Sequence, residues 1–90
     1  MARKNPWRLK RMRKLQERLR LAKIVLAELK KRPLGRTELE KRTIRQCGTH
    51  SAFEGIFRWL VQGGYVAKSE QRHRAPYTIT EKGLKLLEGL

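Results

Sequence analysis

A long stretch without glycine or proline is the feature that most constrains how this chain of 90 residues can fold. The stretch runs from Trp7 to Arg32, follows Asn5-Pro6 and stops at Pro33. Asparagine is a good helix cap and proline suits the first helical turn, whereas a proline further along ends a helix. The sequence therefore predicts one long N-terminal helix. A single small domain has to pack on it, because the chain is too short for two cores.

Apolar residues recur along this helix at spacings of three and four, which is typical of a buried helix face. The regularity resembles that of a coiled coil, although it lasts only about two heptads. The residues are Met12, Leu15, Leu19, Ala22, Leu26 and Leu29. Two interpretations stay open: the face packs on the rest of its own domain, or it joins two chains in a homodimer.

The net charge of +15 indicates what the chain binds, since 23 Lys and Arg stand against 8 acids, all of them Glu. So many like charges on a small domain oppose compaction unless a polyanion neutralises them. Nucleic acid is the expected partner, an acidic membrane surface comes second, and a very soluble protein with a solvated basic face is the remaining alternative. The longest apolar run, residues 24–27, is far too short to span a membrane, so no membrane partner is expected.

Over half of that charge lies in the first twenty residues, which hold nine cations and one acid, Glu17. Arginines at several phases of the helix leave little of its surface free of charge. We therefore predict that residues 1–18 project past the core as a basic arm that binds nucleic acid, and that residues 19–90 form the domain. The arm residues predicted to bind are Arg8, Arg11, Arg13 and Lys14.

A short second helix is predicted after the proline. Thr37 and Glu40 fit a capping box, in which the threonine caps the helix and the glutamate reaches back to the cap. The helix is expected to end near Arg42 or Ile44, ahead of a turn centred on Gly48.

A third helix is predicted to open at a second capping box, Ser51 with Glu54, and to end at the pair Gly63-Gly64. Its apolar residues share one face at the spacing of a buried stripe. They are Phe53, Ile56, Phe57 and Leu60. The opposite face carries small and hydrogen-bonding residues, with Glu54 and Trp59 at its edges. These residues are Ser51, Gly55, Arg58 and Gln62.

The exposed face of the third helix, with Trp59 at its edge, is the predicted contact with nucleic acid. Arg58 can bind guanine in bidentate fashion and Gln62 can contact adenine, although either can equally hold a phosphate. Gly55 costs a helix about 1 kcal/mol relative to alanine. Its missing side chain either permits close approach of a nucleic-acid backbone or makes room for another helix.

The hydrophobic period changes to two after the third helix. Residues 65–68 and 77–80 are predicted strands, rich in β-branched and aromatic residues, with a polar segment between them. Thr80 is expected to cap a last helix, whose apolar residues are Leu84, Leu86 and Leu87. The expected fold class is therefore mainly α with a small β-hairpin.

The order of these elements resembles a winged helix-turn-helix domain over about residues 19–90, most closely at "FRWLVQGGYVAKSEQRHRAPYTITEKGLKLLEG". In that superfamily the third helix ends in a leucine, and a glycine with two apolar residues then starts the first wing strand. The positions here are Leu60, Gly64, Tyr65 and Val66. The second wing strand runs into a Y-x-[IL]-T-x-x-G segment, represented by Tyr77, Ile79, Thr80 and Gly83. The chain is similar to compact archaeal and bacterial regulators of the MarR-like and PadR-like kind.

The resemblance implies a recognition helix over about residues 51–63 and a basic wing over residues 68–76. Arg72, His73 and Arg74 would lie at the tip of the wing, where members of the superfamily often touch phosphates or enter the minor groove, which attracts arginine. A solvated hairpin tip is the alternative. The remaining residues predicted to bind nucleic acid are Lys68, Arg36 and Arg45.

The sequence offers little chemistry of other kinds. Cys47 is the only cysteine, which excludes a disulfide framework or zinc knuckle within one chain and favours a reducing setting. His50 lies near Cys47 in the sequence, but His73 is distant and no carboxylate cluster joins them, so no metal site is expected. Without Asp, a phosphate-binding loop or a catalytic set, no enzyme activity and no cofactor are expected.

Double-stranded DNA binding influenced by sequence is the function that these features favour, in a transcriptional regulator or chromatin-associated protein. The alternative is an RNA-binding structural component of a ribonucleoprotein such as a ribosome, because the arm is more basic than a regulator needs. No apolar stretch of signal-peptide length follows the basic N-terminus, so a cytoplasmic, nucleoid-associated protein is expected.

Overall fold

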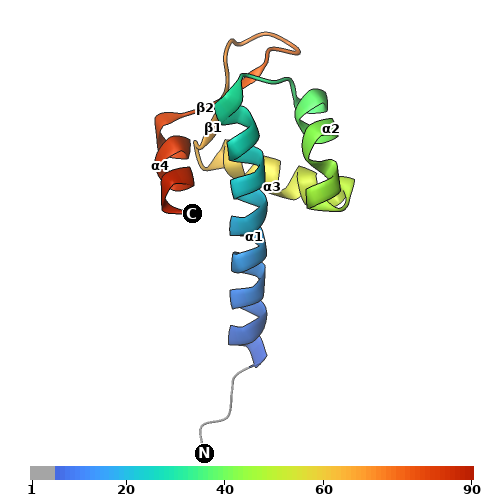
Figure 1. Ribbon diagram of the computed structural model, residues 1–90, viewed down its shortest axis with the longest axis vertical. Coiled ribbons are helices and arrows are strands. Elements are labelled where there is room, and N and C mark those ends of the chain that lie inside the picture. The colour runs from blue at the N-terminus through green and yellow to red at the C-terminus, as the bar shows by residue number, and fades with distance from the viewer. Residues whose placement is uncertain (1–5) are drawn as a thin grey trace, which may run out of the picture.

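The computed structural model describes the backbone of residues 6–90 and the side chains from residue 14 onward. Over these residues the chain forms helices α1 to α3, a two-stranded antiparallel hairpin and helix α4 (Figure 1). The elements are α1 (Pro6–Lys31), α2 (Arg36–Cys47), α3 (His50–Gln62), β1 (Val66–Lys68), β2 (Tyr77–Ile79) and α4 (Glu81–Gly89). The expected class, mainly α with a small β-hairpin, is confirmed.

Helix α1 is the long helix that the sequence predicts, and it begins at Pro6; the expected cap, Asn5, lies outside the described residues. Figure 1 shows α2 and α4 on either side of its C-terminal half, while its N-terminal half extends beyond them. The C-terminal half buries Leu21, Ala22, Val25, Leu26 and Leu29. Half of the predicted apolar face therefore packs on its own domain.

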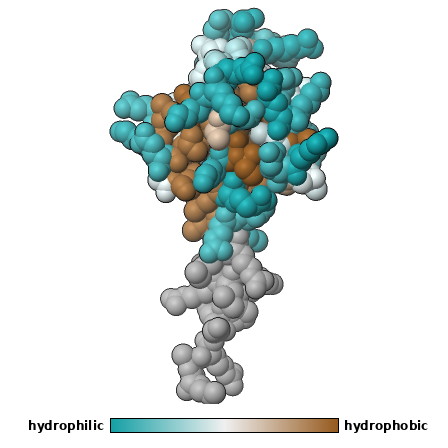
Figure 2. Space-filling view, viewed as in Figure 1, coloured by the Kyte–Doolittle hydropathy of each residue, from teal (hydrophilic) through white to brown (hydrophobic). Residues whose placement is uncertain are grey.

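The other half of that face is not covered. Leu15 is 52% exposed and Leu19 is half-buried, while the side chain of Met12 lies outside the described residues. Apolar surface also gathers on the α4 side of the molecule (Figure 2), where Ile24, Leu86 and Leu87 are partly buried against the core. A homodimer through α1 stays a prediction.

The predicted apolar stripe of α3 forms the centre of the core. Phe53, Ile56, Phe57 and Leu60 are each at most 6% exposed. The rings of Phe53 and Phe57 stack with centroids 5.6 Å apart. Because the spacing repeats every helical turn, this face could be predicted from the sequence alone.

The start of α2 differs from the predicted capping box. Gly35 is the cap residue, without a side-chain hydrogen bond, so Thr37 lies inside the first turn. Glu40 does not reach back, because its carboxylate contacts Nδ1 of His50 in α3 at 2.5 Å. The helix also continues past Ile44 to Cys47. Its buried residues, Leu39, Thr43 and Cys47, are four apart, and this keeps the stripe against the core for another turn.

The start of α3 differs in the same way. Gly48 ends α2 with φ of 94°, a value that glycine adopts without strain. Thr49 follows at once as the cap of α3, and its side chain accepts a hydrogen bond from the Ala52 N–H at 3.0 Å. Ser51 is therefore inside the helix. The predicted box of Ser51 and Glu54 is wrong because the tight turn at Gly48 lets the helix start earlier.

The hairpin pairs Val66 with Ile79 and Lys68 with Tyr77. A further backbone bridge extends this small sheet: Leu34, between α1 and α2, exchanges two hydrogen bonds with Tyr77, at 3.1 and 2.8 Å. At the other end Thr80 caps α4, as predicted, by accepting a bond from the Gly83 N–H. A side chain at Gly83 would lie 2.2 Å from the carbonyl oxygen of Tyr65, so only glycine lets α4 start here.

Candidate nucleic-acid interface

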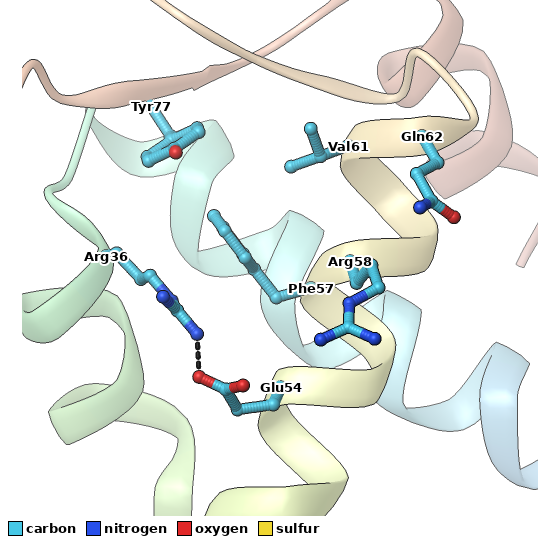
Figure 3. A pocket seen from close by; sticks show the side chains of 7 residues that line it. All are labelled: Arg36, Glu54, Phe57, Arg58, Val61, Gln62 and Tyr77. Atoms are coloured by element: carbon cyan, nitrogen blue, oxygen red, sulfur yellow. Dashed lines mark ion pairs between the residues drawn. The ribbon is translucent and has the colours of Figure 1, made fainter.

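The outer face of α3 presents the residues that the sequence predicts there. Ser51, Gly55, Arg58 and Gln62 are exposed, opposite the buried stripe. Arg58 and Gln62 lie one turn apart on this face (Figure 3). Trp59 is half-buried and turns toward α1. The face is therefore polar and narrow, with long side chains only in its C-terminal half.

A groove runs along one edge of α3, between this helix, the start of α2 and the hairpin. We call it the hairpin-side groove; near α3 its lining consists of Arg36, Glu54, Phe57, Arg58, Val61, Gln62 and Tyr77 (Figure 3). Its floor is aromatic, because the rings of Phe57 and Tyr77 meet edge to face at 4.8 Å. Arg36 and Tyr77 also line the next hollow, together with Lys68, His73 and Arg74. One concave surface therefore extends from α3 to the hairpin loop.

Arg36 is held inside this surface by the protein itself. Its guanidinium forms an ion pair with Glu54 and lies 5.7 Å from the centre of the Phe57 ring. Glu54 in turn is 3.4 Å from Nε2 of His50, whose Nδ1 contacts Glu40. Arg36 is therefore partly neutralised and helps to join α2 to α3. By contrast, no carboxylate of the described residues pairs with Arg58, Lys68 or Arg74, which leaves their charges available to a ligand.

The tip of the hairpin is a tight turn with three basic side chains. Arg72 is paired with Glu70 at 2.8 Å, but both side chains are more than 60% exposed, so water weakens this pair. Arg74 has φ of 65°, a left-handed conformation that is uncommon outside glycine. The N–H of Ala75 closes the turn by donating to the carbonyl of Arg72 at 3.3 Å. His73 and Arg74 thereby border the hairpin-side groove.

A second groove lies along the opposite edge of α3, between this helix and α1. We call it the arm-side groove, and its lining consists of Lys14, Glu17, Arg18, Leu21, Ser51, Ala52, Gly55 and Ile56. Beside it, Trp59 stacks on Tyr65 with ring centroids 5.1 Å apart. Arg18 lies over the Trp59 ring, 5.6 Å from its centre, and Lys82 lies over the Tyr65 ring at 4.7 Å. This stack of two rings, with a cation on each, ties α1, α3 and α4 together.

Gly55 has no packing role in this arrangement. A side-chain carbon built there would meet no described atom within 4 Å, so the glycine does not make room for another helix. Within the described residues that interpretation is wrong, and the close approach of a ligand stays a prediction.

Other predicted residues fall outside the two grooves or outside the described side chains. Arg45 is exposed in the last turn of α2 and lines neither groove. Lys14 lines the arm-side groove. The side chains of Arg8, Arg11 and Arg13 lie outside the described residues.

Sequence reasoning missed Arg18, Tyr65, Tyr77 and Lys82 as parts of the candidate site. Tyr77 was predicted as a strand residue, and nothing in its local pattern shows that it faces Phe57. Arg18 was counted within the basic arm. Its place over Trp59 depends on how α1 crosses α3, which is a tertiary contact that neither helix encodes alone.

Burial and hydrogen bonding shift the pKa values of a few titratable groups. Burial raises the pKa of the Cys47 thiol, which disfavours the reactive thiolate. A hydrogen bond from Arg20 holds the pKa of Glu17 below its usual range. Within the described part of the chain, no three potential ligands gather into a metal-binding group. None of the described helices is long and apolar enough to cross a membrane.

No family model, curated protein or solved structure matches this chain.

Proposed function

We propose that the protein binds double-stranded DNA through the outer face of α3 and the hairpin, as a winged helix-turn-helix transcriptional regulator or chromatin-associated protein. The observation that carries the proposal is the hairpin-side groove. It joins Arg58 and Gln62 on α3 to Lys68, His73 and Arg74 on the hairpin, in a chain with a net charge of +15. Such a role implies an association with the nucleoid.

The shape of this surface suits B-form DNA. The major groove of B-DNA is about 12 Å wide and admits one helix, whereas the major groove of A-form RNA is too deep and narrow for side chains to read. Arg58 is then placed to contact guanine and Gln62 to contact adenine. The hairpin lies to one side of α3, where phosphates border the groove, and phosphate contacts fix the position of the protein on the duplex.

The bridge of Leu34 to Tyr77 supports the winged-helix part of the proposal. It adds a short third segment to the hairpin and anchors it beside α2 and α3. In this arrangement the hairpin serves as the wing and α3 as the recognition helix. The alternative is an RNA-binding component of a ribonucleoprotein, which the strongly basic start of α1 favours.

Selection of binding sites from random duplexes, followed by affinity measurements on the selected and random sequences, tests the proposal. We expect Arg58→Ala to cost about 1–3 kcal/mol on the selected site and little on random DNA. The double variant of Arg72→Ala and Arg74→Ala should weaken both kinds of DNA alike, because phosphates carry little sequence information. Arg32→Ala is the matched control, since it removes an exposed arginine that lines neither groove and is not among the predicted contacts.

Two results would overturn the proposal. One is a selection that yields no motif, together with equal losses for Arg58→Ala on selected and random duplexes; this would leave an architectural binder. The other is tighter binding to structured RNA than to duplex DNA at the same salt concentration, which would favour the ribonucleoprotein alternative.

A further inference from the structure

The arm-side groove contains a glycine that the folded domain does not require. Gly55 lies in the middle of α3, where alanine is favoured by about fivefold in the helix-coil equilibrium. A side-chain carbon there would point into open space, and its backbone is not among those with positive φ. Neither packing nor backbone geometry within the described residues explains the glycine. What it leaves is a bare strip of helix backbone at the surface.

Two cations border this bare strip from the side of α1. Lys14 and Arg18 line the groove opposite Ser51 and Gly55, and no carboxylate of the described residues pairs with either cation. Glu17 also lines the groove, but its carboxylate accepts two hydrogen bonds from Arg20, at 2.7 and 3.1 Å. The acidic charge is thus offset by its own neighbour, and the groove as a whole favours an anion.

The stack beside the groove restrains Arg18. Its guanidinium lies over Trp59, which is itself stacked on Tyr65. A planar guanidinium on an aromatic face keeps its N–H donors at the rim, and a side chain that is already ordered loses less entropy when it binds. Arg18 is therefore prepared to donate hydrogen bonds at the edge of the arm-side groove.

We propose that the arm-side groove holds a phosphate strand of duplex DNA, with Lys14 and Arg18 on phosphate oxygens and the strand passing directly over Gly55. This inference rests on the proposed function and extends it. A helix about 10–12 Å across fills a major groove about 12 Å wide, so one phosphate strand must lie along each edge of α3. The hairpin-side groove takes one strand and the arm-side groove takes the other. The N-terminal half of α1 is then a second part of the DNA-binding surface.

Gly55→Ala tests the close approach, because its effects on folding and on binding should have opposite signs. Alanine should raise the melting temperature, since it is the better helix former and has room. The added methyl should lower affinity for duplex DNA by about tenfold, roughly the effect of one lost contact at an interface. Gly89→Ala is the matched control: it adds the same methyl in open space on α4, away from both grooves, and should leave affinity unchanged.

Two further measurements test the same inference without relying on Gly55→Ala. The double variant of Lys14→Ala and Arg18→Ala should reduce the slope of log affinity against log salt by about 2, because each phosphate contact contributes about 0.9. In a Trp7→Phe background, Trp59 is the one remaining tryptophan. Its fluorescence should change when duplex is added, and Arg18→Ala should reduce that change.

The outcomes separate this inference from the proposed function. Suppose that Arg58→Ala weakens binding to the selected site, while Gly55→Ala and the double variant of Lys14→Ala and Arg18→Ala bind duplex DNA like the intact protein. The second strand then does not lie in the arm-side groove, and the proposed function still stands. If the intact protein does not bind duplex DNA, both are overturned. If Gly55→Ala changes self-association and not DNA binding, the groove joins two copies of the chain, and the inference is wrong.

Discussion

The two halves of α1 are continuous in backbone and alike in the spacing of their apolar residues, yet their surroundings differ. From Leu21 to Leu29 the helix is enclosed by the rest of the domain, and Ala22, Val25 and Leu26 have no exposed surface. From residue 14 to residue 20 the same helix borders α3 along the arm-side groove and contacts α2 through a hydrogen bond from Arg20 to the Gln46 carbonyl, while Leu15 is 52% exposed. The inner half holds the domain together, and the outer half presents charge.

This difference shows what periodicity can and cannot predict. Apolar spacing of three and four specifies a helix with one apolar face, and both halves satisfy it. Whether that face is buried depends on how much chain remains to cover it. The sixty residues or so after α1 make two full helices, a hairpin and a short helix, and these cover only the C-terminal half of α1.

The largest effect is expected from a core deletion in the inner half. Leu26→Ala should reduce the free energy of unfolding by about 2–5 kcal/mol, because it opens a cavity in a fully buried site. Leu15→Ala in the outer half is the matched control and should cost less than about 0.5 kcal/mol. Urea unfolding followed by circular dichroism measures both. Equal losses that depend on protein concentration would mean that Leu15 is covered by a second chain.

The next largest effect is expected in duplex binding, when the start of the outer half of α1 is removed. Deleting residues 1–14 removes seven cations and no acid. The salt slope of duplex binding, expected at about −5 to −9 for about 6–10 phosphate contacts, should become shallower by up to about 6. The melting temperature should stay the same, because Leu21 is the first buried residue among the described side chains.

Three results would contradict these expectations. A large fall in the melting temperature would show that the outer half is part of the core. A loss of affinity confined to structured RNA would instead move the ribonucleoprotein alternative ahead of DNA binding. An intact-protein slope shallower than about −2 would mean that the charge is mostly solvated surface.

The smallest effect is expected from the exposed pair of Glu17 and Arg20. Arg20 holds the pKa of Glu17 below its usual value, so the pair stabilises the folded state above about pH 4.3, the ordinary pKa of glutamate. This contribution is lost as pH falls through the lowered pKa, because the unfolded state then binds the proton more readily. The intact protein should melt at a higher temperature than Glu17→Gln near neutral pH, and this difference in melting temperature should shrink toward zero in acid. A difference that does not vary with pH would exclude the pair as its cause.

Local patterns account for the parts of the fold that the sequence predicted well. The buried stripe of α3, the cap at Thr80 and the glycine turn at Gly48 each depend on residues within a few positions of one another. The winged helix-turn-helix assignment also began as a pattern of this kind. It stays a prediction. The order of elements is compatible with the winged helix-turn-helix superfamily but does not establish that the chain belongs to it.

The errors at the start of α2 occurred where a distant partner competed with a local one. Glu40 has the spacing of a capping box, but it contacts His50, ten residues away in the chain. Thr37 is not the cap, because α2 starts immediately after Gly35. Leu34, the residue before Gly35, is held by the bridge to Tyr77. The floor of the hairpin-side groove likewise joins Phe57 to Tyr77 across two elements. Such pairs follow from the path of the whole chain, and no single window of sequence contains them.

The bridge between Leu34 and Tyr77 has a mechanical consequence for the hairpin. Without it, the hairpin would be joined to the domain by the turn after α3, the start of α4 and the packing of Val66 and Tyr77 on the core. With two hydrogen bonds from Tyr77 to the segment between α1 and α2, the hairpin is also held at the loop end of β2. A force on Arg72 or Arg74 is therefore expected to displace the loop more than the strands of the hairpin. Through Leu34, the same bridge connects the hairpin to the segment that leads into α2.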